Sequence, residues 1–162
     1  MSIDELIERL ENAEGPNRWL DAKIDAAFRI GTKKMRGQGY EWAWKNFPTW
    51  AHHKQQRGMC GVQHANGDLG LVWDSMEFTS SIDAALLLLQ TAFPGWGGLF
   101  SFGSGENIHR ADIWSERRGT QSSEDEEGNP LVGEDADGEH ASPAIALCIA
   151  ILKAKQAQEV SA

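Results

Sequence analysis

The chain has 162 residues, of which 41% are hydrophobic and 9% aromatic, and its formal net charge is −9. This length and composition predict one folded domain, residues 1–162, with a hydrophobic core large enough to be stable without disulfide bonds or a structural metal ion. They exclude a disordered chain, and no apolar run approaches the roughly 20 residues that a membrane-spanning helix needs.

Two features of the sequence bear on the compartment. Cys60 and Cys148 are too few for a disulfide framework, and the acidic, amphipathic N-terminal residues differ from a secretion leader. We therefore expect a cytoplasmic protein with reduced thiols.

The charge is segregated along the chain. Residues 121–140 carry eight carboxylates and no Lys or Arg, which accounts for nearly all of the net charge. Residues 33–57 carry six Lys or Arg side chains against one carboxylate, and five aromatic residues lie between residues 38 and 50. The positive part of the chain therefore coincides with its aromatic part.

Two helices are predicted at the start of the chain. Ser2 and Glu5 form a capping-box pattern, and apolar residues then recur at helical spacing until a Gly-Pro break at 15–16. A second helix is predicted over residues 17–30, with Gly31 as its C-cap.

Strands are predicted next. Residues 40–45 alternate with the period of a strand. Residues 59–73 predict two short strands about the turn Asn66-Gly67, a dipeptide that favours tight hairpins.

The middle of the chain predicts another helix and two further strands. Thr79 or Ser80 is expected to cap a helix whose residues 82–89 are apolar nearly all round, so that we expect its burial on more than one side. Strands are then predicted at 99–102 and 111–115.

The end of the chain combines an acidic stretch with a helix. The charge density of residues 120–141 predicts a solvated, flexible insertion. Ser142 and Pro143 then predict the start of an apolar helix, with Lys153 and Lys155 near its C-terminal end.

A short repeat bears on the fold. IDAA occurs at residues 24–27 and 82–85, each time in a predicted helix that precedes predicted strands. The pattern indicates an internal αββ pseudo-repeat, although a good helix sequence can also recur by chance. We expect an α/β (α+β) fold, a compact sandwich in which a mostly antiparallel central sheet is flanked by helices.

Four stretches carry a resemblance to a known family. They are LIERLE followed by GP near the N-terminus, FTSSIDAALLLL at 78–89, PGW at 94–96 and SPAIALCIAILKA at 142–154. In these stretches the chain resembles the phage ABA-sandwich domain, a family of small phage and prophage proteins. The resemblance implies a compact, phage-encoded α/β sandwich and no particular activity. The basic aromatic segment and the acidic insertion depart from the family pattern, so we expect a specialised function in one of them.

Residues 33–57 form the candidate ligand site. Indole rings stack on nucleobases and Lys or Arg pair with phosphates, so this segment is predicted to bind a small phosphate-bearing aromatic ligand. The alternative is that its aromatic side chains belong to the core. The negative net charge opposes binding to long nucleic acid, and a nucleotide or cyclic oligonucleotide fits better. The predicted ligand-binding residues are Lys34, Arg36, Tyr40, Trp42, Trp44, Lys45, Trp50, His53 and Arg57.

Motifs for metal binding and catalysis are weak. The His and Cys residues between 52 and 64 lack zinc-finger spacing, and DADG at 135–138 lacks the remainder of a calcium loop. The chain has no GxSxG elbow, and Cys148 lies in an apolar helical run. We therefore expect no metal, no cofactor, no catalytic residue and a protein that is not an enzyme.

Three functions remain open. The favoured one is a phage counter-defence protein that sequesters a nucleotide-like immune signal in the host cytoplasm. The second is a phage inhibitor that binds a host defence protein through its acidic surface, because carboxylates can imitate nucleic acid, although the acidic run can equally be a solvated loop. The third is a structural or regulatory phage protein without a ligand. We also expect a homo-oligomer, since Trp-rich edges often anchor interfaces.

Overall fold

The computed structural model describes residues 1–30, 49–52, 58–63, 69–102, 107–115 and 134–161, which form four helices and two three-stranded sheets. The helices are α1 (Ile3–Glu11), α2 (Arg18–Phe28), α5 (Ile82–Ala92) and α6 (Pro143–Ser161). The strands are β1 (Thr49–His52), β2 (Met59–Gln63), β3 (Leu69–Asp74), β4 (Gly97–Phe102), β5 (His109–Trp114) and β6 (Asp135–His140). Neighbouring strands pair antiparallel in the orders β1-β2-β3 and β4-β5-β6.

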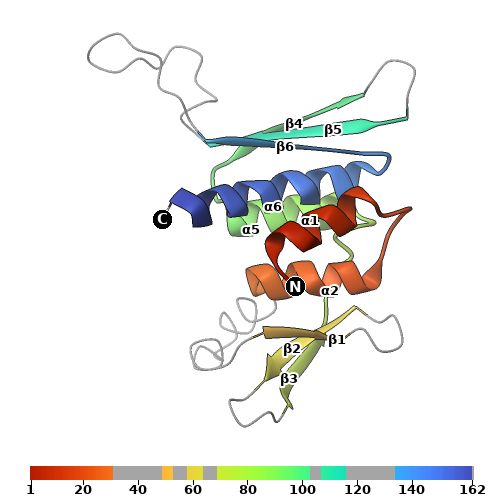
Figure 1. The fold of residues 1–162 in the computed structure, drawn as a ribbon, viewed down its shortest axis with the longest axis vertical. Helices are drawn as coiled ribbons and strands as arrows, with labels where there is room; N and C mark the ends of the chain where they lie inside the picture. Colours follow the sequence, from red (N-terminus) through yellow and green to blue (C-terminus); the bar gives the residue numbers. More distant parts are fainter. Residues whose placement is uncertain (31–48, 53–57, 64–68, 103–106, 116–133, 162) are drawn as a thin grey trace.

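The helices lie between the two sheets (Figure 1). Sheet β4-β5-β6 covers α6, and sheet β1-β2-β3 packs on α2 at the opposite end of the molecule (Figure 1). The predicted α+β class with antiparallel pairing is confirmed. The predicted central sheet is wrong, because in the described part of the chain the strands form two separate outer sheets and the helices occupy the centre.

Helix α6 explains this layer order. Every residue from Ala144 to Leu152 is buried, so the helix needs neighbours on all sides. α1, α5 and the strands β5 and β6 supply them. The predicted start is confirmed, since Ser142 Oγ accepts a hydrogen bond from the Ile145 backbone N–H at 3.4 Å.

Three helix ends differ from prediction. α2 ends two residues early, with Arg29 as its C-cap in the left-handed conformation (φ 54°) in place of Gly31. α5 is capped by Ser81, whose side chain accepts from Ala84 N, whereas the Thr79 side chain is buried and its Oγ1 accepts from Asn17 N at 2.9 Å. α6 runs on to Ser161, so its lysines lie before the last turn.

The predicted acidic insertion over 120–141 is wrong for its last residues, which form β6. Acidic residues alternate there with Ala136, Gly138 and His140, and Gly138 is buried against α6. A Cβ atom at Gly138 would overlap the Ala146 carbonyl and lie 2.8 Å from Ala150 N. Glycine thus lets an acidic strand pack closely on the central helix.

The remaining predictions divide into two groups. The capping box at the start of α1 and the strand pairs β2-β3 and β4-β5 are confirmed. The predicted strand at 40–45 lies outside the described residues. The two IDAA helices, α2 and α5, each precede a three-stranded antiparallel sheet, but the strands do not join in one sheet, and the duplication stays a prediction.

Candidate functional site

The predicted ligand residues lie almost entirely outside the described part of the chain. Lys34 through Lys45 fall in residues 31–48, and His53 and Arg57 fall in residues 53–57. Trp50 lies in β1, where its backbone pairs with Gly61 of β2. The binding prediction for these nine residues therefore stays a prediction.

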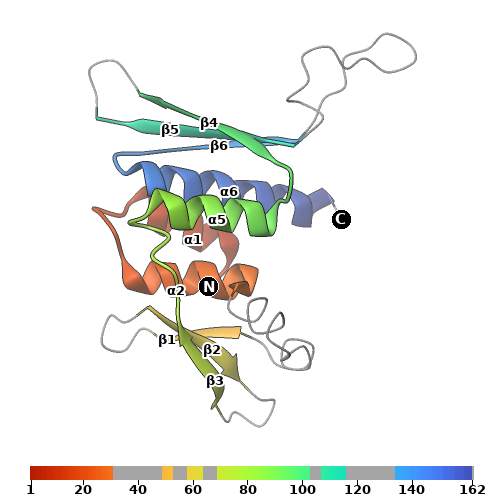
Figure 2. The same ribbon diagram turned by 180° about the vertical axis from the view of Figure 1, so that it is seen from behind.

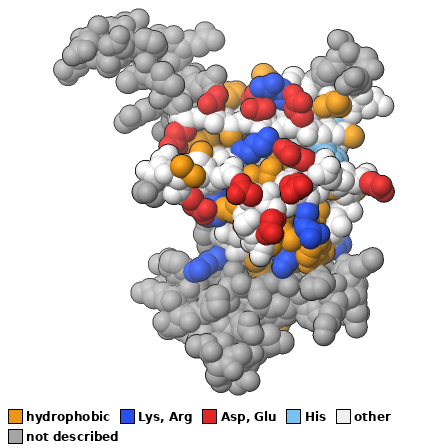
Figure 3. Space-filling view, in the orientation of Figure 1, with side chains coloured by type: hydrophobic (Ala, Val, Ile, Leu, Met, Phe, Trp, Pro, Cys, Tyr) orange, Lys and Arg blue, Asp and Glu red, His pale blue; other side chains and the backbone are white. Residues whose placement is uncertain are grey.

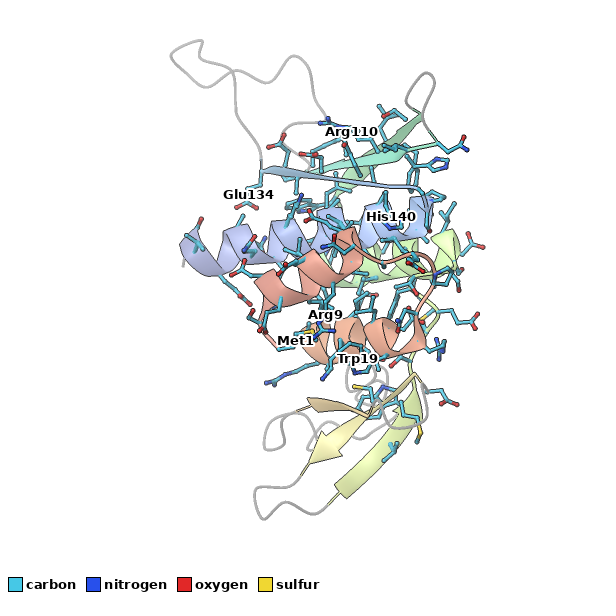
Figure 4. All side chains as sticks on the ribbon, turned by 45° about the vertical axis from the view of Figure 1, so that its right-hand side comes forward. Met1, Arg9, Trp19, Arg110, Glu134 and His140 are labelled. Carbon is cyan, nitrogen blue, oxygen red and sulfur yellow. The ribbon has the colours of Figure 1, made fainter. Side chains whose placement is uncertain are left out.

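A cavity of about 800 Å³ lies where the described chain leaves α2. The start of α1, the ends of α2 and α5, and the last turns of α6 form its walls. The described residues that line it are Met1, Ser2, Ile3, Ala26, Ala27, Phe28, Arg29, Ala92, Phe93, Lys155, Gln158 and Glu159. Met1 marks its position in Figure 4.

Cationic and aromatic groups meet in this cavity. The Lys155 ammonium lies 5.4 Å from the centroid of the Phe28 ring and 3.0 Å from a carboxylate oxygen of Glu159. Arg29 contributes a second, exposed cation, placed there by its left-handed backbone. Phe93 forms part of the apolar wall and packs against Trp96 with the two rings tilted by 34° and their centroids 4.7 Å apart.

This lining suits binding better than catalysis. Two cations beside apolar and aromatic walls can hold an anion that carries a ring or another apolar group. Among the described lining residues there is no His or Cys, and Glu159 is the one carboxylate. The Ser2 hydroxyl already accepts from Glu5 N as a helix cap. General acid–base or nucleophilic chemistry therefore has few groups to use here.

A buried carboxylate network joins α2 to the loop that follows β3. Asp21 accepts from Thr79 N (2.8 Å) and from Arg18 Nη1 (2.9 Å), while Arg18 Nη2 donates to the carbonyl of Ser75 (2.7 Å). Burial raises the pKa of Asp21, and the hydrogen bonds from Thr79 and the charge of Arg18 oppose that rise. Both carboxylate oxygens are occupied by the protein itself, so we assign this network to the fold.

A second buried carboxylate lies one turn further along α2. Asp25 Oδ2 accepts from the indole Nε1 of Trp73 at 3.1 Å, which ties β3 to the helix. Sequence reasoning missed both carboxylates. The available signal was that Asp21 and Asp25 lie next to the apolar positions Leu20 and Ile24, on the face of α2 that should be buried.

The cysteines are structural. Both thiols are buried, and burial raises the pKa of Cys60 and Cys148 far above the usual range. Cys148 donates to the Phe78 carbonyl at 3.4 Å, as expected of a core thiol. Across the residues that the structure describes, no group of three His, Cys, Asp or Glu side chains is arranged to hold a metal ion.

An acidic surface lies on the outer face of sheet β4-β5-β6. The strand register places Asp112 beside Asp137 and Arg110 beside Glu139. Arg110 lies between the carboxylates of Asp112 (3.1 Å), Glu139 (3.6 Å) and Asp137 (3.8 Å), and it is labelled on this face in Figure 4. Figure 3 shows the carboxylates around basic side chains at this end of the molecule.

Helix α1 packs on α2, and cation–aromatic contacts join the two helices. Arg9 lies over the Trp19 ring at 4.8 Å, and Lys23 lies near the same ring at 5.6 Å (Figure 4). These cations stabilise the pairing of the two helices.

Comparison of the chain with protein-family models, with curated proteins and with solved structures finds no match. Within the described residues, no helix is both long and apolar enough to cross a bilayer.

Proposed function

We propose that this chain binds and sequesters a small nucleotide-like ligand at the end of α2. The observation that supports the proposal is the cavity of about 800 Å³, in which Phe28 and Phe93 accompany Arg29 and Lys155. From this cavity the chain continues into residues 33–57, the segment with five excess positive charges and the densest aromatic content.

The chemistry of the two parts is complementary. Ligand pockets typically measure about 300–1,000 Å³, so the cavity has room for a mononucleotide or for one half of a cyclic dinucleotide. Arg29 and Lys155 would pair with phosphate in exchange for their present contacts, which for Lys155 is the ion pair with Glu159. The predicted residues Trp42 and Trp44 would stack on a base, and Lys34 and Arg36 would pair with further phosphate.

The biological role that we propose follows from the resemblance to the phage ABA-sandwich domain. A phage protein that holds a nucleotide-like signal without converting it would remove that signal from a host defence pathway. Such a protein acts in the host cytoplasm and needs neither a metal nor a catalytic group.

Ligand binding can be tested by titrating the protein with a panel of mono-, di- and cyclic nucleotides. Trp fluorescence and the melting temperature are followed together, since a ligand at a hundred times its Kd adds about 2.7 kcal/mol of stability. Lys155→Gln, Arg36→Ala and Trp44→Ala are expected to weaken binding at least tenfold. Lys153→Gln is the matched control, because Lys153 lies on the same helix but pairs with Glu11, outside the cavity.

The variants separate the two halves of the site. Loss of binding in Arg36→Ala and Trp44→Ala with full binding in Lys155→Gln would remove the cavity from the proposal. A panel that moves neither signal at millimolar concentration would overturn nucleotide binding altogether.

A second candidate function is a phage inhibitor of a host defence protein, favoured by the carboxylates around Arg110. The predicted partner has a basic, nucleic-acid-binding surface. In an infection assay with a nuclease-based host defence, Asp137→Asn combined with Glu139→Gln should abolish protection of the phage, while Lys155→Gln should leave it intact. The opposite pattern would support the ligand-binding function.

A further inference from the structure

Helix α5 exposes apolar side chains that a single chain does not cover. Its sequence, IDAALLLLQTA, contains one charged residue, Asp83. The core buries Ala84, Ala85, Leu88 and Leu89, while Ile82 and Leu87 remain 39% and 44% exposed. An all-round apolar helix is normally covered on several sides, so α5 has a free face.

Among the described strands, β4 lies at an edge of its sheet and lacks the charges or proline that usually hinder further pairing. Its sequence, GGLFSF, has no charged residue and no proline, and Leu99 is 59% exposed. The other edge of the same sheet, β6, carries Asp135, Asp137 and Glu139. Proteins commonly protect free edges with charge or proline, so the two edges differ in their capacity to pair.

The helix and the strand lie on one side of the molecule. Only residues 93–96 separate α5 from β4 in the chain, and both elements face the viewer in Figure 2. A partner that pairs with β4 would therefore also reach the exposed face of α5.

We propose that this side binds a second copy of the chain, by antiparallel pairing of β4 with β4 about a two-fold axis. The pairing that places Leu99 opposite Leu99 of the second copy also places Phe100 opposite Gly98. An aromatic ring beside an edge glycine fills the space that the missing side chain leaves. The same two-fold axis brings α5 toward α5 of the second copy and covers Leu87.

The described carboxylates on the outer face of the sheet oppose the pairing of β4 with β4 only weakly. The nearest of them, Asp112, lies on β5 beside Leu99. In the joined sheet, the two copies of Asp112 would be three strand spacings apart, roughly 14 Å. This exceeds the screening length of about 8 Å at physiological ionic strength, so their repulsion is weak. Pairing through β6 would instead place carboxylates on adjacent strands.

Sedimentation equilibrium across the micromolar range tests the dimer, because an interface of one helix and one strand is small and should dissociate measurably. Leu99→Lys and Leu87→Lys should each raise the dimer Kd about tenfold or more. Val72→Lys and Val160→Lys are matched controls, since these valines are 42% and 82% exposed on β3 and α6. Melting curves verify that each variant is folded. A monomeric wild type, or a dimer that Leu99→Lys leaves unchanged, would overturn the proposal.

Cross-linking tests the register. The proposed pairing puts the Cα atoms of residue 99 about 5 Å apart, within the range of a disulfide, and those of residue 101 roughly 14 Å apart. Leu99→Cys should therefore form a disulfide-linked dimer under mild oxidation, and Ser101→Cys should not. The wild type controls for background, because Cys60 and Cys148 are buried. Equal cross-linking of the two variants would contradict this register.

Discussion

The two sheets have the same size and strand order but are joined to the helices by different chemistry. Sheet β4-β5-β6 packs on α6 through Ala111, Ile113 and Gly138, which are buried against an apolar helix. Sheet β1-β2-β3 is held to α2 by buried polar groups, with Trp73 bonded to Asp25 and Arg18 bridging Asp21 to Ser75. An apolar junction depends on shape, whereas a polar junction depends on every charge keeping its partner.

The largest effect is expected at the apolar junction. In Gly138→Ala, the new Cβ meets the backbone of α6, which cannot move without disturbing the core, so we expect about 3 kcal/mol of destabilisation in urea unfolding. Gly15→Ala is the control, since a Cβ there meets nothing within 4 Å. A loss below about 1 kcal/mol for Gly138→Ala would mean that the strand can move away from α6.

Removing a charge from the polar junction should cost somewhat less. Arg18→Met keeps the side-chain stem but leaves the buried Asp21 without its cation, and because Arg18 is 32% exposed we expect about 2 kcal/mol of destabilisation. Lys153→Met removes one partner of the more exposed pair with Glu11 and should cost about 0.5 kcal/mol or less. Equal losses in the two variants would show that burial of Asp21 does not matter.

A single hydrogen bond of the polar junction should contribute less again. Trp73→Phe removes the indole N–H that Asp25 accepts, with an expected loss of about 1–2 kcal/mol in thermal unfolding. Amide hydrogen exchange should show the change first in β2 and β3. Trp96→Phe, which keeps a ring against Phe93, serves as the aromatic control. Faster exchange in β5 and β6 instead would refute a local role for Trp73.

The smallest effect is a difference in pH dependence. The pKa of Asp21 is raised, so the folded chain holds this proton more tightly than the unfolded chain. The contribution of protonated Asp21 to the free energy of unfolding is therefore fully present below the ordinary pKa of 3.8. It is lost as the pH rises through the pKa of Asp21 in the folded chain. The free energy of unfolding of the wild type should therefore rise relative to that of Asp21→Asn as the pH falls from neutral to about 3.

Glu5 provides the opposite sign within the same chain. Hydrogen bonds from Ser2 lower the pKa of Glu5, so its contribution is present above the ordinary value of 4.5 and is lost as pH falls through the folded-state pKa. The free energy of unfolding of the wild type should therefore fall relative to that of Glu5→Gln as the pH falls across the same range. Urea midpoints measured in pH series test both signs, and parallel pH curves for the two variants would contradict the assignment.

Local signals predicted most of the elements. The capping box of Ser2 and Glu5, the Asn66-Gly67 turn signal within 59–73 and the Ser142-Pro143 start of α6 all specify structure through neighbours in the chain. The end of α2 at Arg29 and the start of α5 at Ser81 were both mispredicted, the latter because a tertiary contact overrode the local preference. The Thr79 hydroxyl, a good cap by sequence, instead accepts a hydrogen bond from Asn17 N at 2.9 Å.

The candidate site also has one part that the sequence predicts and one part that only the tertiary structure shows. The aromatic and basic residues of segment 33–57 are visible in the sequence and remain a prediction. The cavity combines Phe28, Arg29, Phe93 and Lys155, which come from three helices far apart in the chain, and no local sequence pattern predicts that they meet.

The sequence by itself determined the α+β class, the antiparallel hairpins and the apolar last helix, because spacing and capping act over a few residues. Only the tertiary structure decided that the helices lie between two sheets and that acidic residues 135–140 form a strand. Both outcomes depend on α6, whose apolar residues 144–152 must be covered on every side, and on Gly138, whose missing side chain lets β6 cover them.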